Sequence, residues 1–200
     1  MLLDPTWTEK TLFSFGRDPL GMQATSVRIY RSLVPGLTNV TNRLRYYSFY
    51  CWAVDTWGRR EHANHTKRWR AFIRRAEVLY TTASLIADRD ASGGMGGREW
   101  AEKNLEVVRH APELDLAAHD DADSGESYLK AKAGNFGQFY LASMLDSRML
   151  SPSSGVPLID PQLGRALADA FAAAVGDAAE RSADAILAGR IPTADLEPIG

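Results

Sequence analysis

Apolar side chains are densest between residues 35 and 58, in the stretch PGLTNVTNRLRYYSFYCWAVDTWG. Apolar positions recur there at three- and four-residue intervals, which predicts one buried helical stripe formed by Leu44, Tyr47, Cys51 and Val54. Further aromatic residues fill most of the remaining circumference. A helix that is apolar nearly all round, without a run of membrane length, belongs at the centre of a core. The pattern therefore predicts a central helix over residues 38–58, with Thr38 as its N-cap.

Helical periodicity also flanks this stretch on both sides. The spacing from Thr6 to Glu9 is that of a capping box and predicts a short helix to about residue 15. A second helix should occupy residues 19–34, because Pro35 stops it. A third should open at His65, and a fourth should follow the glycine run and cover residues 98–110. Together these patterns predict a helical bundle domain over residues 1–111.

The carboxy-terminal half has a different character. Residues 112–125 are acidic and rich in small side chains, which predicts a linker. Helices are expected over 127–133 and 135–147, a short β-hairpin over 148–159, a helix capped by Asp160, and a last helix from Asp177 to Gly189. This order is typical of a winged helix, so we expect a winged-helix-like domain over 126–190 and a tail over 191–200. The predicted fold class is mainly α.

Charge is distributed unevenly, although the formal net charge is only −2. Between residues 43 and 77 nine Lys or Arg stand against Asp55, Glu61 and Glu77, whereas acidic residues dominate after residue 112. The acidic half is either a complementary face or a solvated one, and the basic window favours an anionic partner. The candidate nucleic-acid-binding residues are Arg43, Arg45, Arg59, Arg68, Arg70, Arg74 and Arg75. Direct DNA readout by the winged-helix-like part is disfavoured, since its second helix has no Lys or Arg and its hairpin only Arg148.

Other chemistries find little support in the sequence. The first residues lack the basic and apolar regions of a signal peptide, and we expect a cytoplasmic protein. The single Cys51 permits no intramolecular disulfide and reads as a small buried residue. The glycine run over 93–97 lacks the Lys-Ser/Thr of a phosphate-binding loop, and the acidic residues of 120–126 lack the spacing of a calcium loop. No metal and no cofactor are therefore expected.

One short pattern indicates a possible reaction. Arg60 and His65 have the Arg-to-His spacing of HEPN ribonucleases, in which these residues act on the RNA 2′-hydroxyl and the scissile phosphate. The pattern is short and lies between two predicted helices, whereas that family carries it inside a late helix. Solvated loop residues are the competing interpretation.

The segment GRDPLGMQATSVRIYRSLVPGLTNVTNRLRYYSFYCW, with its Arg-x-Arg-Tyr-Tyr-x-Phe-Tyr-x-Trp motif, resembles an uncharacterised prokaryotic family of phage-defence and restriction loci. The later Gly-Gly-Met-Gly-Gly-Arg turn and the LDSRML…GRALADAF ending are similar in placement. The resemblance implies an accessory or sensing subunit that works with other proteins, and it brings no catalytic residues.

The residues and the resemblance together predict a non-enzymatic module of an anti-phage defence system that binds nucleic acid or a partner protein. Two alternatives stay open: a HEPN-like, metal-independent ribonuclease using Arg60 and His65, and a purely structural subunit of a larger complex. Expected partners are other defence-system subunits, DNA or RNA, and a second copy of the chain, but not a membrane.

Overall fold

The computed structural model describes residues 22–33, 41, 43–61, 65–87, 96–125, 127–153 and 155–197. The chain divides into two compact units, Met1–Pro35 and Gly36–Gly200. In the first unit the described element is helix α1 (Met22–Leu33), which lies within the range predicted from the apolar spacing. The predicted helix over residues 6–15 lies outside the described residues.

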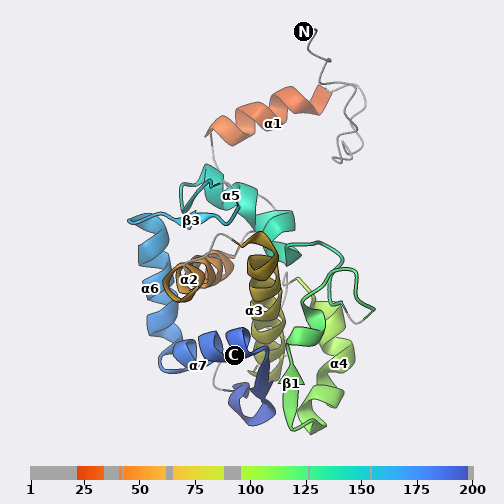
Figure 1. Cartoon of the computed structure of the whole chain (residues 1–200). Helices are drawn as coiled ribbons and strands as arrows, with labels where there is room; N and C mark the ends of the chain where they lie inside the picture. Colours follow the sequence, from red (N-terminus) through yellow and green to blue (C-terminus); the bar gives the residue numbers. More distant parts are fainter. Residues whose placement is uncertain are drawn as a thin grey trace, which may run out of the picture. The chain divides into compact units, whose positions relative to one another are not determined.

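The second unit is mainly helical (Figure 1). Its longer helices are α2 (Leu44–Arg60), α3 (Thr66–Ala87), α4 (Arg98–His110), α6 (Leu163–Val175) and α7 (Ala178–Ala188). A π-helical turn, η3 (Phe136–Tyr140), leads directly into α5 (Leu141–Asp146). Two short antiparallel pairs complete the unit: β1 (Glu113–Asp115) with β4 (Arg190–Pro192), and β2 (Leu150–Ser151) with β3 (Leu158–Ile159). Single 3₁₀ turns, η2 (Ala117–His119) and η4 (Thr193–Asp195), follow β1 and β4.

Helix α2 is the central element, as its apolar circumference predicts. Every residue from 49 to 57 is buried, and α2 lies between α6 and α3 (Figure 1). The helix begins later than expected, at Leu44, with Arg43 in an extended N-cap conformation, so Thr38 is not its cap. It also continues through Gly58 to Arg60. The central position is confirmed, and the predicted boundaries were wrong by several residues at the start.

Aromatic rings build the core around α2. Phe49 stacks on Tyr80 of α3 with ring centroids 4.4 Å apart, and Trp52 contacts Phe171 of α6 at 5.4 Å. Such pairs add to the free energy gained from burying their apolar area. The rings are enclosed by their own chain, so in this structure they offer no surface for docking a partner.

The predicted linker over 112–125 is a packed segment. Leu114 lies opposite Ile191, one residue from each strand of the β1–β4 pair, and both side chains are buried. The predicted tail over 191–200 supplies the partner strand, so linker and tail pair with each other. Each strand has three residues and only one inward apolar side chain, which is too short for a two-residue periodicity to be recognised.

Residues 36–200, on both sides of the predicted linker, form one compact unit. Helix α6, from the predicted second domain, packs along α2 of the predicted first. The hairpin is confirmed as β2–β3. The expected helix over 127–133 is absent from the described part of that range, which forms bends and turns.

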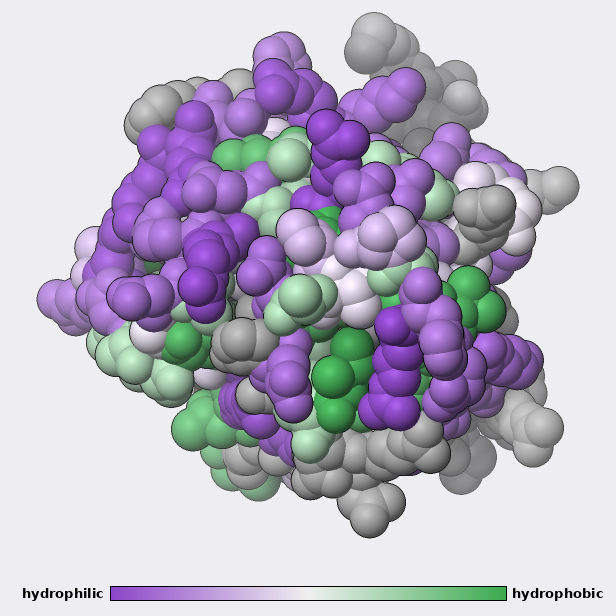
Figure 2. All heavy atoms as spheres, turned by 90° about the horizontal axis from the view of Figure 1, so that it is seen from below, coloured by the Kyte–Doolittle hydropathy of each residue, from purple (hydrophilic) through white to green (hydrophobic). Residues whose placement is uncertain are grey.

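The molecular surface is mixed in polarity. Figure 2 shows a face covered mostly by hydrophilic side chains, with apolar atoms in small separate groups. Within the described ranges, no helix combines the length and the apolar character needed to cross a bilayer.

Candidate functional site

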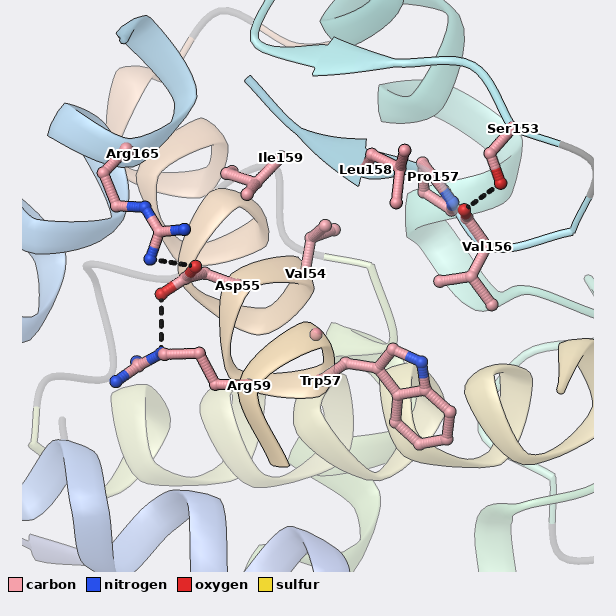
Figure 3. A pocket seen from close by; sticks show the side chains of 11 residues that line it. Val54, Asp55, Trp57, Arg59, Ser153, Val156, Pro157, Leu158, Ile159 and Arg165 are labelled. Carbon is pink, nitrogen blue, oxygen red and sulfur yellow. Dashed lines mark hydrogen bonds and ion pairs between the residues drawn. The ribbon is translucent and has the colours of Figure 1, made fainter. Parts of the chain in front are cut away.

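A cleft of about 650 Å³ opens beside the carboxy-terminal half of α2 (Figure 3). Its walls come from three elements: α2, the β2–β3 hairpin and α6. Most of the lining side chains are apolar, and the exceptions are a carboxylate, two guanidinium groups and a hydroxyl. The lining residues are Val54, Asp55, Trp57, Gly58, Arg59, Ser153, Val156, Pro157, Leu158, Ile159 and Arg165.

The charged part of the cleft is centred on Asp55, whose residue exposure is only 3%. Arg59 Nε lies 2.9 Å from Asp55 Oδ2, and Arg165 Nη1 lies 2.5 Å from Asp55 Oδ1. The two arginine side chains are 52% and 41% exposed. A buried carboxylate therefore holds two guanidinium groups (Figure 3), each of which retains N–H donors that Asp55 does not use.

The hairpin wall is fixed by local hydrogen bonds. Ser153 Oγ donates to the Val156 carbonyl at 2.6 Å, which closes the loop between the strands. Asp160 Oδ1 accepts from the amides of Gln162 and Leu163 at 3.0 and 2.7 Å. This agrees with the predicted capping role of Asp160 and sets the first turn of α6, from which Arg165 reaches Asp55.

A second buried carboxylate, Glu77 of α3, has a different environment. Its oxygens accept from Tyr50 Oη at 3.0 Å, from Tyr128 Oη, and from the amides of Asn135 and Phe136 at 2.9 and 2.7 Å. The two amides belong to the start of the helical segment that contains η3, where a negative charge is favourable. Burial raises the pKa of Glu77, and the four donors oppose that shift. Glu77 therefore fixes one helix start to α3 and α2.

Arg74, one turn before Glu77, is wholly buried. Its guanidinium donates to the carbonyls of His119, Ala131 and Leu129 and to Ser127 Oγ, at 2.6–3.0 Å. It also lies 4.8 Å from the centre of the Tyr128 ring. The prediction that Arg74 contributes to an exposed anion-binding face was therefore wrong, because its donors are used inside the protein.

Two further candidate arginines also have partners within the chain. Arg75 binds Asp120 through two contacts of 2.5 and 2.7 Å and donates to the last carbonyls of α7. Arg60, the candidate HEPN arginine, pairs with Glu180 and Asp184 of α7, which raises its pKa. Three acidic residues of the carboxy-terminal half, Asp120, Glu180 and Asp184, thus pair with arginines of the basic window.

The remaining candidate arginines lie at exposed positions. Arg45 lies over the Tyr80 ring at 5.5 Å, Arg68 pairs with Glu61 at 2.5 Å, and Arg43 and Arg70 are exposed. Arg59 belongs to the cleft. These groups are divided between α2 and the first turns of α3, and the next two arginines of α3, Arg74 and Arg75, bind acceptors within the protein.

The predicted ribonuclease pair is not assembled by a contact between its members. His65 is exposed immediately before α3, and its carbonyl accepts from the Trp69 amide at 2.9 Å. Among the described residues, we find no interaction between His65 and Arg60. The side chain of Arg60 instead joins α2 to α7.

The last two glycines of the run, Gly96 and Gly97, allow close packing against neighbouring side chains. Gly97 has φ +84°, and a Cβ there would lie 2.6 Å from the Tyr128 ring; a Cβ at Gly96 would collide with the Asn135 side chain. Glycine therefore lets this turn approach the network around Glu77. Residues 93–95 lie outside the described residues.

Two further groups of residues bear on metal and thiol chemistry in the described part of the chain. No group of three or more His, Cys, Asp or Glu in the described ranges is placed to hold a metal ion. Burial raises the pKa of the Cys51 thiol to about 12, with Asp160 and Asp55 adding to the shift. A thiol with such a pKa is a poor nucleophile near neutral pH, which agrees with its prediction as a small buried residue.

Arg165 was not predicted as a site residue from the sequence, and neither was the role of Asp55 or Gly58. Arg165 occurs in an Ala-rich amphipathic helix, where a single arginine reads as solvent-facing. Asp55 read as one of three acidic residues in a basic window. The available signal was Asp55 itself, a carboxylate within an otherwise apolar helix, since such a group needs cationic or hydrogen-bonding partners.

Comparison of the chain with protein-family models, with curated proteins and with solved structures gave no match.

Proposed function

We propose that this chain is a non-enzymatic accessory or sensing module of a prokaryotic anti-phage defence system, and that it binds a partner protein. The observation that carries the proposal is the cleft between α2, the hairpin and α6. A mostly apolar concavity with a few oriented polar groups is typical of binding sites. The defence context rests on the Arg-x-Arg-Tyr-Tyr-x-Phe-Tyr-x-Trp resemblance.

We regard the carboxy-terminal part as winged-helix-like in this proposal. The segment η3–α5, the β2–β3 hairpin and α6 follow one another in the order expected for the later part of such a module, without the first helix expected over 127–133. The absence of Lys and Arg from residues 135–147 argues for protein binding over DNA readout. The hairpin then serves as one wall of the partner site.

The test is co-expression with the proteins encoded by neighbouring genes, followed by gel filtration with light scattering. We expect a stable heterocomplex that Leu158→Arg abolishes, because Leu158 is 58% exposed at the rim of the cleft. Val107→Arg is the matched control, since Val107 is 68% exposed on α4 and does not line the cleft. No complex with any neighbour, or equal loss in both variants, would contradict the proposal.

Nucleic-acid binding is the second candidate, favoured by the exposed Arg43, Arg45 and Arg70. Phosphate contacts release counterions, so affinity for duplex DNA or RNA should fall steeply with salt. Fluorescence anisotropy between about 50 and 200 mM salt measures this slope. A flat response would remove the candidate. The ribonuclease hypothesis requires Arg60 to leave Glu180 and Asp184, and equal RNA cleavage by wild type and His65→Ala would end it.

A further inference from the structure

We infer that the cleft recognises a peptide segment of the partner that places one carboxylate beside an apolar side chain. This inference rests on the proposed protein-binding function and specifies its chemistry. The cleft volume of about 650 Å³ lies within the range of ligand sites, about 300–1,000 Å³. Its walls, from Val54, Val156 and Pro157 among others, offer apolar contact, so the ligand must bring an apolar group.

The net charge of the cleft indicates which polar group the ligand carries beside its apolar group. Among the described residues that line it, two guanidinium groups face one carboxylate, which leaves one net positive charge. Asp55 uses one donor atom of each arginine, so both forks retain N–H groups for a further acceptor. An arginine held in place loses little side-chain entropy when a carboxylate binds. A single carboxylate therefore matches both the charge and the donors.

The same geometry disfavours a nucleic acid in the cleft. Proteins that bind single strands present aromatic faces on which bases stack. Trp57 is the aromatic residue in the lining, and its ring packs against Trp69 and Phe72, with centroids 5.8 and 5.4 Å apart. Its residue exposure is only 3%, so it cannot serve as a stacking platform. A phosphate chain would also bring more negative charge than the site balances.

Gly58 provides a variant that fills the cleft without breaking the charge pairs. It lies within α2 and lines the cleft, and a Cβ at this position would meet no atom within 4 Å. Gly58→Leu should therefore be accommodated, and helix propensity favours Leu over Gly. Its melting temperature should equal or exceed that of the wild type. Gly125→Leu is the matched control, because Gly125 is exposed, has equally open space and lies outside the cleft lining.

The experiment selects a displayed random dodecapeptide library on the full chain and measures the enriched peptides by fluorescence anisotropy. We expect sequences with one Asp, Glu or terminal carboxylate next to Leu, Ile, Val or Phe. Affinity should fall at least about tenfold, the equivalent of one lost charge-assisted contact, in Gly58→Leu, in Arg165→Gln and when the peptide carboxylate becomes an amide. Amidating the peptide terminus separates a terminal from a side-chain carboxylate. Gly125→Leu should bind like the wild type.

The outcomes separate the two proposals. Enriched peptides that bind Gly58→Leu and wild type equally would place recognition elsewhere, which overturns the cleft assignment and leaves protein binding intact. Enriched apolar peptides without a carboxylate would overturn the role of the arginines. Failure to enrich any peptide, together with no complex in co-expression, would overturn both. If Arg165→Gln melts early, Gly58→Leu still decides the outcome.

Discussion

Asp55 and Glu77 are two carboxylates of equal burial, each 3% exposed, on neighbouring helices of one core, yet their partners differ in kind. Glu77 accepts from four donors, all of them within the protein and all close to full burial. Asp55 is bound by two arginines whose side chains are half-exposed. A fully enclosed set of partners fixes the fold, whereas partners that reach solvent remain available to a ligand. We therefore expect Glu77 to act chiefly on stability, whereas the Asp55 cleft is where we propose binding.

The largest loss of stability should come from Glu77→Gln. The amide nitrogen would face two donors that need an acceptor, and each unsatisfied buried group costs about 1–3 kcal/mol. We expect the free energy of unfolding to fall by about 4 kcal/mol, measured by urea denaturation. Glu61→Gln is the control, since a surface pair with Arg68 contributes at most about 1 kcal/mol. Equal effects would contradict the comparison.

The raised pKa of Glu77 also predicts how the stability of the protein changes with pH. Because burial raises the pKa of Glu77 above its usual value of 4.5, the folded state binds the proton more tightly than the unfolded state. The part of the folding stability that comes from binding this proton is present below the unfolded pKa and is lost as pH rises through the folded pKa. The wild type should lose more stability over this window than Glu77→Gln. Parallel pH profiles would exclude the shift.

Gly134→Ala should have the next largest effect. Gly134 has φ +61°, and a Cβ there would collide with the Glu77 carboxylate and the Tyr128 hydroxyl. Gly176 has a similar φ of +64° but open space around its Cβ position. A non-glycine residue in a sparsely populated backbone region costs about 1–3 kcal/mol. Gly176, with ψ −141°, lies outside the left-handed helical region, so we expect a loss of about 2 kcal/mol from backbone strain in Gly176→Ala and about 3 kcal/mol from strain and collision together in Gly134→Ala. Denaturation midpoints of the two variants measure these losses.

Asp55→Asn should destabilise less than Glu77→Gln. Both arginines can turn their donors toward water when the carboxylate is neutralised, so the expected loss is about 1–2 kcal/mol. Peptide binding in the cleft should weaken as well, because the guanidinium groups lose their fixed orientation. Thermal unfolding and anisotropy measure the two effects. A stability loss as large as that of Glu77→Gln would show that Asp55 is chiefly structural.

The smallest effect concerns Cys51, one turn before Asp55 on α2. Its thiol is fully buried and has a pKa of about 12, so a disulfide reagent at pH 8 should not react with the folded protein. Labelling should proceed only through unfolding, at a rate that follows global stability across the variants above. Rapid labelling in native buffer would reveal local opening of α2 beneath the cleft.

The helical elements were largely readable from the sequence because amphipathic periods of about three to six turns are long enough to stand out. This holds for α3, which begins one residue after the predicted opening at His65, for α4, which covers the predicted range, and for the β2–β3 hairpin with its Ser/Pro/Gly turn. Residues 112–125 were misread as a linker because their polar side chains were counted as solvated. Asp120 binds Arg75, and the carbonyls of His119, Leu129 and Ala131 bind Arg74. Nothing in local sequence distinguishes a solvated arginine from one whose acceptors lie some 50 residues away.

The sequence by itself determined that the chain is mainly helical and that α2 is its centre. The apolar periodicity that makes a helix buried is a property of one continuous segment and can be recognised without knowing the rest of the fold. Only the tertiary structure decided which charges are free. Arg60, Arg74 and Arg75 are used within the chain, while Arg59 of α2 and Arg165 of α6 meet on Asp55 from positions more than a hundred residues apart. Charge pairing depends on distance in space, so the cleft that combines two arginines on Asp55 with apolar walls becomes visible only when the chain is folded.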